Sequence, residues 1–196
     1  MALSDPIVTV LLCIAAYLAG SVLFALPVCQ LFGLPDPRAQ GSGNPGATNV
    51  YRTGGWLPAL ITLALDAAKG WLPVWLAHQT GLSPLVQAMI SLCAVTGHMI
   101  PAFYRFKGGK GVATALGAGL ALAPVTTFVM AALWLLIIWR WRISALASVI
   151  AIVCGPVISA LIEPDHLPLF GLLAILIVVR HRNNLIRLAQ GRETGL

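Results

Sequence analysis

The stretch VATALGAGLALAPVTTFVMAALWLLIIW, from Val112 to Trp139, decides how this chain is folded. It is 28 residues long and contains no charged side chain. About 20 apolar residues cross the hydrocarbon core of a bilayer, so the stretch is longer than one ordinary span. Pro124 follows Ala123 near its middle, and a proline removes a hydrogen bond from a helix interior. The stretch therefore predicts either one long tilted helix or two helices broken near Ala123 and Pro124.

The composition of the whole chain indicates a membrane protein. Of its 196 residues, 59% are hydrophobic and only 9% are charged, and the mean hydropathy is +0.90. Soluble domains carry roughly 25% charged residues. Because a chain this apolar cannot cover its surface with polar groups, we expect lipid to be its solvent and reject a soluble helical core.

Five other apolar runs are candidates to span the membrane. They are Pro6–Leu26, Trp56–Ala77, Leu85–Phe103, Ile143–Ile162 and Leu167–Val179. The last run has a short apolar core and is expected to borrow flanking residues. These runs predict an all-α, polytopic membrane protein. No internal repeat is visible, and we expect residues 1–196 to form a single domain.

The basic residues decide whether the Val112–Trp139 stretch is one helix or two. Cytoplasmic loops carry an excess of Lys and Arg. With an outside N-terminus and two segments, all twelve basic residues fall on the inner side or at its edge, and Asp5, Glu163 and Asp165 fall outside. Lys69 lies within a helix and is counted with the inner half only loosely. With one helix, six basic residues would move outside: Arg140, Arg142, Arg180, Arg182, Arg187 and Arg192. We therefore predict two segments, about seven in all, and a cytoplasmic C-terminus.

Two segments require one unusually short membrane helix. Val112–Ala123 is 12 residues, or about 18 Å at 1.5 Å per residue. That length does not cross a bilayer alone. The segment must be a half-helix sheltered by its neighbours, or the membrane must be thin around it.

The net charge indicates which molecules the chain could bind, and the cysteines indicate whether it has disulfides or a metal site. The charge of +6 lies in short loops between apolar runs, which fits anionic lipid or phosphate and argues against nucleic acid. None of the four cysteines forms a CxxC pair, so we expect neither a disulfide framework nor a metal site.

The first polar segment is GSGNPGATNVYR, from Gly41 to Arg52. Its glycines match GxGxxG, but a dinucleotide site needs a preceding strand, and here a membrane helix and a Pro-rich loop precede it. Glycines let successive backbone N–H groups form a nest for an anion, and the Arg52 guanidinium suits phosphate. The other candidate residues of this segment are Ser42, Gly43, Asn44, Thr48 and Asn49. The alternative interpretation is a turn followed by a helix cap.

The second polar segment is RFKGGKGVAT, from Arg105 to Thr114. It is not a Walker A loop, because Tyr104 stands where the first glycine belongs and Gly111 replaces the Ser or Thr. A glycine-rich turn with lysines before a helix still suits a phosphate. Its candidate residues are Gly108, Gly109, Lys110 and Gly111. The alternative is a basic membrane anchor, which would not need these glycines.

The third polar segment is RHRNNLIRLAQGRE, from Arg180 to Glu193. If it is helical, His181 and Asn184 are three residues apart and share a face. His181 could titrate near neutral pH and act on a hydroxyl proton. The alternative is a basic tail held by lipid headgroups.

Two ionisable residues lie inside a predicted membrane helix. Asp66 and Lys69 are three residues apart, and such residues in a bilayer usually face a protein interior. We favour an ion pair that supports the site, and the alternative is that Lys69 binds a substrate phosphate. For His98, a structural hydrogen bond is favoured over catalysis.

Together the three segments resemble a known family. In order and spacing, GSGNPGATNVYRTGG, GHMIPAFYRFKGGKGVAT and RHRNNLIRLAQGRE are similar to the three signature motifs of the bacterial acyl-phosphate:glycerol-3-phosphate acyltransferases (PlsY family). The resemblance implies a multi-pass inner-membrane enzyme with its active site on the cytoplasmic face. It implies transfer of a fatty acyl group from acyl phosphate to the 1-position of glycerol 3-phosphate, giving lysophosphatidic acid and phosphate, without cofactor or metal. It also suggests functional coupling to the enzyme that makes acyl phosphate.

The resemblance also assigns roles to residues. It implies that Ser42, Arg52, Lys110, His181 and Asn184 are catalytic and that Glu193 is mainly structural. Leu185 stands where the family pattern leads us to expect isoleucine, a conservative change. Whether His181 is a base or only binds substrate stays open, as does which phosphate each basic residue holds.

Other classes of protein remain as alternatives. Acyltransferases that use HxxxxD are excluded, because no histidine has an aspartate five positions later. An anion or phospholipid transporter would explain the half-helix and Lys69, but the inner loops have no outer counterpart. A structural scaffold for lipid enzymes is the third hypothesis.

Overall fold

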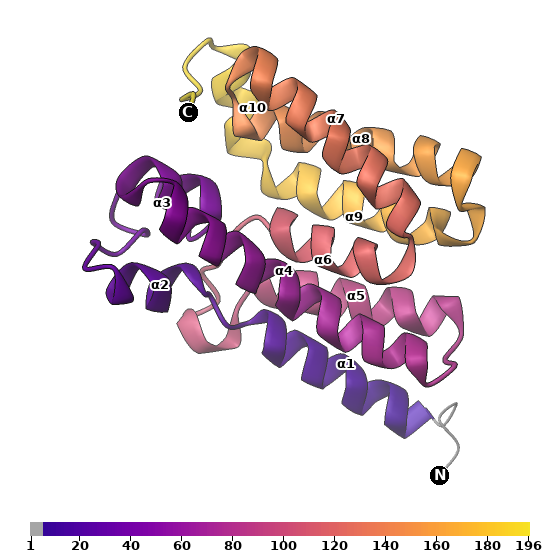
Figure 1. Ribbon diagram of the computed structural model, residues 1–196. Helices are drawn as coiled ribbons and strands as arrows, with labels where there is room; N and C mark the ends of the chain where they lie inside the picture. Colours follow the sequence, from indigo (N-terminus) through magenta and orange to yellow (C-terminus); the bar gives the residue numbers. More distant parts are fainter. Residues whose placement is uncertain (1–5) are drawn as a thin grey trace. The chain divides into compact units, whose positions relative to one another are not determined.

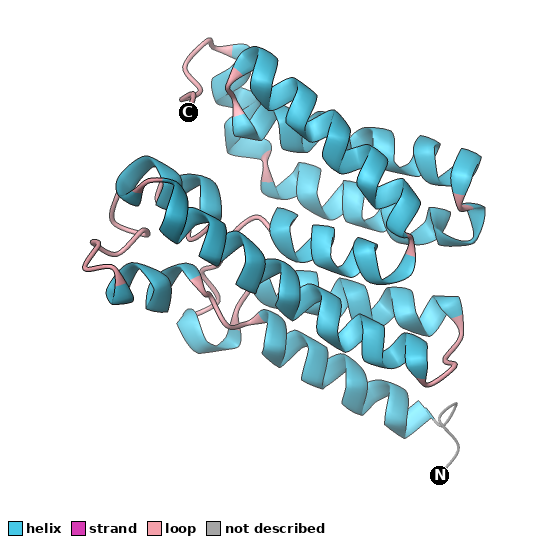
Figure 2. Ribbon diagram, in the orientation of Figure 1, coloured by secondary structure: helices cyan, strands magenta, loops and turns pink. Residues whose placement is uncertain are grey.

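The computed structural model describes residues 6–196, so Asp5 lies outside the described residues. The described part consists of helices, turns and loops without a strand, which confirms the all-α prediction (Figure 2). The α-helices are α1 (Pro6–Gly20), α2 (Ala25–Leu31), α3 (Ala47–Gly54), α4 (Trp56–Gln79), α5 (Pro84–Met99), α6 (Val112–Leu122), α7 (Pro124–Trp141), α8 (Ser144–Ile162), α9 (Leu167–Arg180) and α10 (Arg182–Ala189). Two 3₁₀ turns lie at Ala102–Tyr104 and Pro164–His166.

The membrane segments agree with the prediction of about seven, one of them short. Within residues 6–196, five helical segments are long and apolar enough to cross a membrane, and they are Pro6–Leu31, α4, Pro84–Tyr104, α7 and α8. Pro164–Arg180 and α10, which are bent by 62°, make a sixth when the pair is counted as one span. The apolar helix α6 is shorter than these spans and corresponds to the short segment of the prediction.

The long apolar stretch is broken where the sequence predicts. Helix α6 ends at Leu122 and α7 begins at Pro124, with Ala123 between them. The start of α7 is capped from a distance, because the backbone N–H of Thr126 donates to Glu163 Oε2 over 2.7 Å. The Ala123 carbonyl accepts from both the N–H and the hydroxyl of Thr127. The prediction of two segments is confirmed.

The first membrane segment departs from the prediction. The sequence predicts an uninterrupted run over Pro6–Leu26, but α1 ends at Gly20 and α2 begins only at Ala25. Ser21 holds the interruption: its hydroxyl donates to the Tyr17 carbonyl over 2.8 Å and accepts from the Ala102 N–H over 3.2 Å. Residues in other parts of the chain therefore determine this break, and the local apolar pattern does not reveal it.

The chain forms two compact units, each described here by itself (Figure 1). In the unit that ends at Ala121, α1 packs against α5 and α4, and α4 packs also against α3 and α2. In the unit that begins at Leu122, α8 packs against both α7 and α9, and α10 contacts α8 and α9. A single acyltransferase domain over residues 1–196 stays a prediction.

Glycines let the helices of the first unit approach closely. A methyl group on Gly20 in α1 would collide with the backbone of Ala94 in α5, and one on Gly97 in α5 would collide with the Tyr17 carbonyl in α1. A methyl group on Gly70 in α4 would meet the backbone of Thr114 in the same way. Small residues at such crossings are typical of helices that pack inside membranes.

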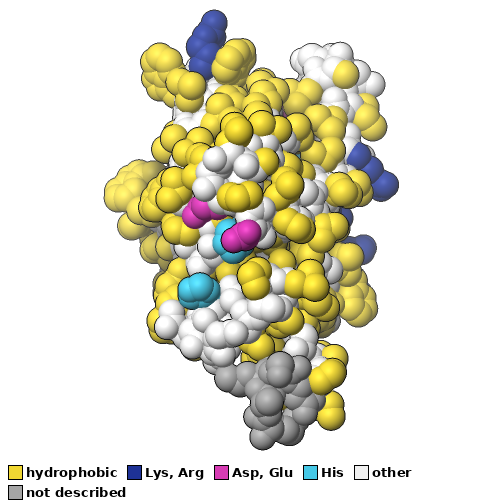
Figure 3. Space-filling view, turned by 90° about the vertical axis from the view of Figure 1, so that its right-hand side faces the viewer, with side chains coloured by type: hydrophobic (Ala, Val, Ile, Leu, Met, Phe, Trp, Pro, Cys, Tyr) yellow, Lys and Arg dark blue, Asp and Glu magenta, His cyan; other side chains and the backbone are white. Residues whose placement is uncertain are grey.

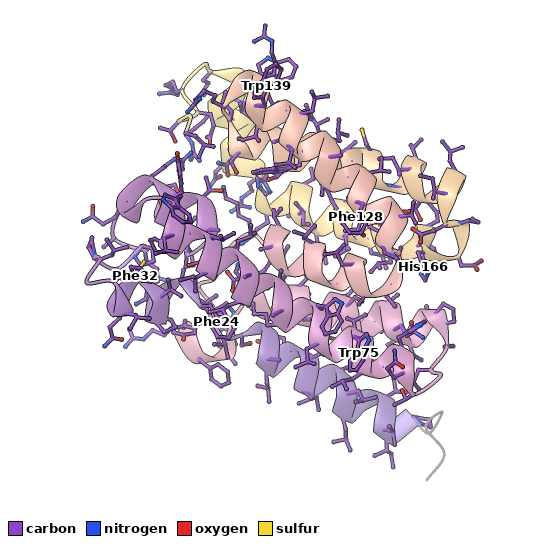
Figure 4. All side chains as sticks on the ribbon, viewed as in Figure 1. Phe24, Phe32, Trp75, Phe128, Trp139 and His166 are labelled. Atoms are coloured by element: carbon purple, nitrogen blue, oxygen red, sulfur yellow. The ribbon has the colours of Figure 1, made fainter. Side chains whose placement is uncertain are left out.

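The outer surface is suited to lipid. In Figure 3 hydrophobic side chains cover most of the visible face, and charged ones are few. Leu161 in α8 is 81% exposed and Trp139 in α7 is 77% exposed. Figure 4 places Trp139 and His166 toward opposite ends of the second unit. Exposed apolar side chains on this scale would be unfavourable in water, which supports a location in the bilayer.

We expect Gly20→Ala to lower the melting temperature of the purified protein in detergent. The added methyl group must push α1 away from α5, and overpacking of this kind costs about 1–3 kcal/mol. Gly171→Ala in α9 is the matched control, because no atom beyond its chain neighbours and the nearby backbone of its own helix lies within 4 Å of the position where its methyl group would be. Equal melting temperatures for the two variants would contradict the close approach of α1 and α5.

Candidate active site

The Asn49 side chain organises the first polar segment. It is 1% exposed, although it lies in a loop-rich part of the chain. Its Oδ1 accepts from the Ser42 N–H over 2.9 Å, and its Nδ2 donates to the carbonyls of Pro37 and Gln40 over 2.7 and 3.0 Å. A single amide thus fixes the backbone from residue 37 to Ser42.

The glycines of this segment have the conformations that the turn requires. Gly41 and Gly43 have φ angles of 56° and 69°, in the left-handed region that L side chains rarely adopt. A methyl group on Gly41 would also collide with the Asn49 side chain. Helix α3 follows at Ala47 and places Thr48, Asn49 and Arg52 directly after the turn.

The second polar segment is a tight loop between α5 and α6. Arg105 and Phe106 have φ angles of 52° and 59°, and Gly111 has 79°. The loop is closed by its own backbone, because the Phe106 N–H donates to the Pro101 carbonyl over 3.1 Å and the Gly109 N–H donates to the His98 carbonyl over 3.0 Å. Lys110 and Gly111 come immediately before α6, so the predicted glycine-rich turn before a helix is present.

One contact joins the residues that lie just before the first two segments. The Arg38 guanidinium lies 5.9 Å from the centre of the Tyr104 ring, in a cation–π arrangement. Arg38 also pairs with Asp36 over 2.6 Å. Hydrogen bonds from Arg38 keep the pKa of the Asp36 carboxyl below its ordinary value, so the carboxylate and the guanidinium both stay charged. The contact between Arg38 and Tyr104 was not predicted from the sequence, because nothing in their spacing indicates it.

The third polar segment is built around Glu193. The Glu193 carboxylate accepts from Asn184 Nδ2 over 2.6 Å and from Arg187 Nε over 2.7 Å. Its side chain is 5% exposed and Asn184 is 3% exposed. Glu193 therefore holds Asn184 in place, as a mainly structural residue would, while the involvement of Arg187 was not predicted.

His181 lies at the bend between α9 and α10. It is 1% exposed, and its Nδ1 lies 2.8 Å from the Ile177 carbonyl oxygen. Since a carbonyl only accepts, Nδ1 carries a hydrogen, and in the neutral ring Nε2 is then the acceptor. The bend does not separate His181 from Asn184, because the Leu185 N–H donates to the His181 carbonyl over 2.9 Å and His181 directly precedes the first residue of α10. The expected helical spacing of the two residues is present, and both side chains are buried.

The two ionisable residues of α4 form the expected ion pair. Asp66 Oδ1 and Lys69 Nζ are 2.7 Å apart, with both side chains buried. In the part of the chain that the structure describes, no three His, Cys, Asp or Glu side chains are grouped so that they could hold a metal ion.

Comparison with known proteins identifies the family. Residues 10–191 match the family of glycerol-3-phosphate acyltransferases. The glycerol-3-phosphate acyltransferase of Hahella chejuensis is 52% identical over 181 residues, covering 92% of this chain and 93% of the relative. This chain belongs to the glycerol-3-phosphate acyltransferase family. The member of the family from Idiomarina loihiensis is 43% identical over 185 residues, with 94% of each chain covered.

Solved structures of a family member have the same fold. They are crystal structures of PlsY (YgiH), an integral membrane glycerol 3-phosphate acyltransferase, in a glycerol 3-phosphate form and a lysophosphatidic acid form. The TM-scores are 0.90 and 0.88, the identities are 38% and 37%, and each match covers 96% of this chain and 95% of the other. The family resemblance of the three motifs is thus confirmed, and the roles of the individual site residues stay predictions.

We expect Asn49→Asp to loosen the first polar segment. The change removes both Nδ2–H donors and leaves the Pro37 and Gln40 carbonyls without this partner, and an unsatisfied buried group costs about 1–3 kcal/mol. Hydrogen exchange of the amides of residues 37–43 should become faster. Thr53→Val is the control, because the Thr53 hydroxyl bonds only to carbonyls of its own helix. Unchanged exchange in Asn49→Asp would contradict this role of Asn49.

Proposed function

We propose that this protein transfers a fatty acyl group from acyl phosphate to the 1-position of glycerol 3-phosphate, giving lysophosphatidic acid and phosphate. The observation that carries the proposal is the presence of all three polar segments in a chain of the glycerol-3-phosphate acyltransferase family. Glycerol 3-phosphate and lysophosphatidic acid, which give their names to the two solved forms of PlsY, are then the acceptor and the product.

The basic residues would neutralise the phosphates of the two substrates. Arg52 offers a planar guanidinium at the end of the first segment, and Lys110 offers an ammonium at the glycine-rich turn. The backbone at Gly43, Gly108, Gly109 and Gly111 and the side chains of Asn44 and Thr48 would add hydrogen bonds. The Ser42 hydroxyl would bond the reacting phosphate or carbonyl. Asn184, fixed by Glu193, would bind substrate from the third segment.

The chemical step needs little assistance from acid or base. The 1-hydroxyl oxygen of glycerol 3-phosphate attacks the carbonyl carbon of the donor, and the bond from that carbon to the phosphate oxygen breaks. Because acyl phosphate is a mixed anhydride, phosphate leaves readily, and its own oxygen accepts the hydroxyl proton. Correct alignment of the two substrates contributes about 7–11 kcal/mol in favourable cases. Charge neutralisation by Arg52 and Lys110 would supply the rest.

We assign to His181 the binding and orientation of glycerol 3-phosphate. The hydrogen on Nδ1 points to the Ile177 carbonyl, so the neutral ring has its acceptor at Nε2. An acceptor nitrogen fits a substrate hydroxyl, and the Ile177 contact fixes the direction of the ring.

The orientation in the membrane follows from the charges. We propose an outside N-terminus, a cytoplasmic C-terminus and an active site on the cytoplasmic face of the bacterial inner membrane. The break at Ala123 supports this orientation, because an additional segment keeps the later basic residues on the inner side. A donor that is a reactive anhydride with a membrane-soluble chain also favours coupling to the enzyme that makes acyl phosphate.

We expect the purified protein to release phosphate from palmitoyl phosphate only when glycerol 3-phosphate is present. Lys110→Ala should lower kcat/KM about 100- to 1,000-fold, since it removes a charge opposite the transferring group. Arg140→Ala removes an equal charge from the end of α7, where no role is assigned, and should stay near wild type. Wild-type protein without activity would favour a transporter, and an unaffected Lys110→Ala would favour a scaffold.

We expect His181→Gln to keep kcat within about tenfold of wild type while KM for glycerol 3-phosphate rises, because glutamine accepts a hydrogen bond but cannot act as a base. His181→Ala should raise KM further. The pH dependence of kcat should lack an inflection near the ordinary histidine pKa of about 6.5. A fall in kcat of about 100-fold or more in His181→Gln, with such an inflection in wild type, would make His181 the base.

A further inference from the structure

A cluster of three ionisable side chains is buried beneath the second polar segment. Asp66, Lys69 and His98 are 1%, 6% and 3% exposed. Lys69 Nζ lies 2.7 Å from Asp66 Oδ1 and 2.8 Å from His98 Nδ1, and His98 Nδ1 lies 3.7 Å from Asp66 Oδ1. All three belong to the unit that ends at Ala121 and to its membrane helices α4 and α5. Such a costly arrangement calls for a function.

The Lys69 ammonium has three protein partners. Besides Asp66 and His98, it donates to the carbonyl oxygen of Val22, which lies in the interruption between α1 and α2. It also lies 5.7 Å from the centre of the Phe24 ring in the same interruption, which Figure 4 labels. Asp66 is its ion-pair partner, and its hydrogen bonds go to His98 and Val22. Lys69 thus ties the break in the first membrane segment to α4 and α5.

The contact with Lys69 fixes the histidine. Because the ammonium only donates, His98 Nδ1 must accept, and the neutral ring carries its hydrogen on Nε2. The Nε2 side of the ring faces Gly109. A methyl group on Gly109 would lie 2.9 Å from Cδ2 and 3.1 Å from Cε1 of His98, and closer still to Nε2. The Gly109 N–H also donates to the His98 carbonyl over 3.0 Å.

We propose that Asp66, Lys69 and His98 form a brace that positions the backbone of Gly108 and Gly109 for binding of a substrate phosphate. His98 is in this view a positioning residue, which acts through the glycine loop and does not itself contact substrate. The brace assigns to Lys69 a supporting role in place of phosphate binding. The geometry of the brace stands by itself, while the identity of the phosphate rests on the proposed function.

The proposal can be tested with compensating changes in side-chain size at Gly109 and His98. Gly109→Ala adds a methyl group against the His98 ring, and His98→Asn removes the ring while keeping a side-chain acceptor for Lys69. If the ring positions the loop, the two changes compensate each other. Gly108→Ala is the matched control, because its methyl group would collide with the His98 backbone carbonyl and lie 2.8 Å from the Met99 carbonyl. Replacing the His98 side chain cannot relieve that collision.

Steady-state kinetics with palmitoyl phosphate and glycerol 3-phosphate test the positioning role. His98→Asn alone should raise KM for at least one substrate about 10- to 100-fold, the effect of a displacement of the order of 1 Å, with a melting temperature near wild type. The double variant Gly109→Ala/His98→Asn should recover at least about tenfold in kcat/KM over Gly109→Ala. The double variant with Gly108→Ala should recover nothing. Equal recovery in both pairs, or an unchanged KM in His98→Asn, would overturn the proposal.

Hydrogen exchange without substrate separates this proposal from the proposed function. The amides of residues 107–111 should exchange faster in His98→Asn than in wild type, whereas those of α8 should not change. If wild-type protein lacks acyltransferase activity but the loop loosens as expected, the reaction is wrong and the brace is supported. If the reaction proceeds and the loop exchanges at the wild-type rate in His98→Asn, the brace is overturned.

Discussion

A helix that is interrupted in an apolar environment leaves backbone carbonyl and N–H groups that need a partner in the protein. The structure meets this constraint at three interruptions with side chains. Side chains of Ser21 and Lys69 bond to backbone groups at the break after α1. Side chains of Thr127 and Glu163 bond to backbone groups at the break before α7. At the bend after α9, His181 binds the Ile177 carbonyl with its own ring. Several polar residues thus exist because the helices are not continuous.

Much of the helical framework could be predicted from the sequence. Apolar length located most spans, and the distribution of basic residues indicated the break at Ala123. Proline supplied a local signal there, and the structure places Pro124 at the first residue of α7. The break after Gly20 has no such signal, because its partners Lys69 and Ala102 are distant in the sequence. Hydropathy records where a segment is apolar, and long-range hydrogen bonds decide where it stops being helical.

The residues of the candidate site stay predictions, but the structure shows which of them make contacts inside the protein. Asn49 was a substrate-binding candidate of the first segment, and Lys69 was expected either to support the site or to bind a substrate phosphate. Both side chains make several contacts inside the protein. Glu193, which was expected to be mainly structural, accepts a hydrogen bond from Asn184, and its role stays a prediction. The identity of a polar residue does not show whether its side chain bonds to a ligand or to a carbonyl of the protein. Only the coordinates of its neighbours distinguish the two.

The glycine contacts among the first unit's helices have a consequence for the movement of lipid. Where Gly20 meets Ala94, and where Gly117 in α6 meets the backbone of Ala67, main chain touches main chain. A hydrocarbon tail needs carbon–carbon distances of about 3.5–4 Å on each side, so it cannot pass through these crossings. The glycines therefore act as seals against bilayer chains as well as points of close packing. At these two crossings the first unit is closed to a fatty chain, so a chain that contacts this unit lies along other helix boundaries.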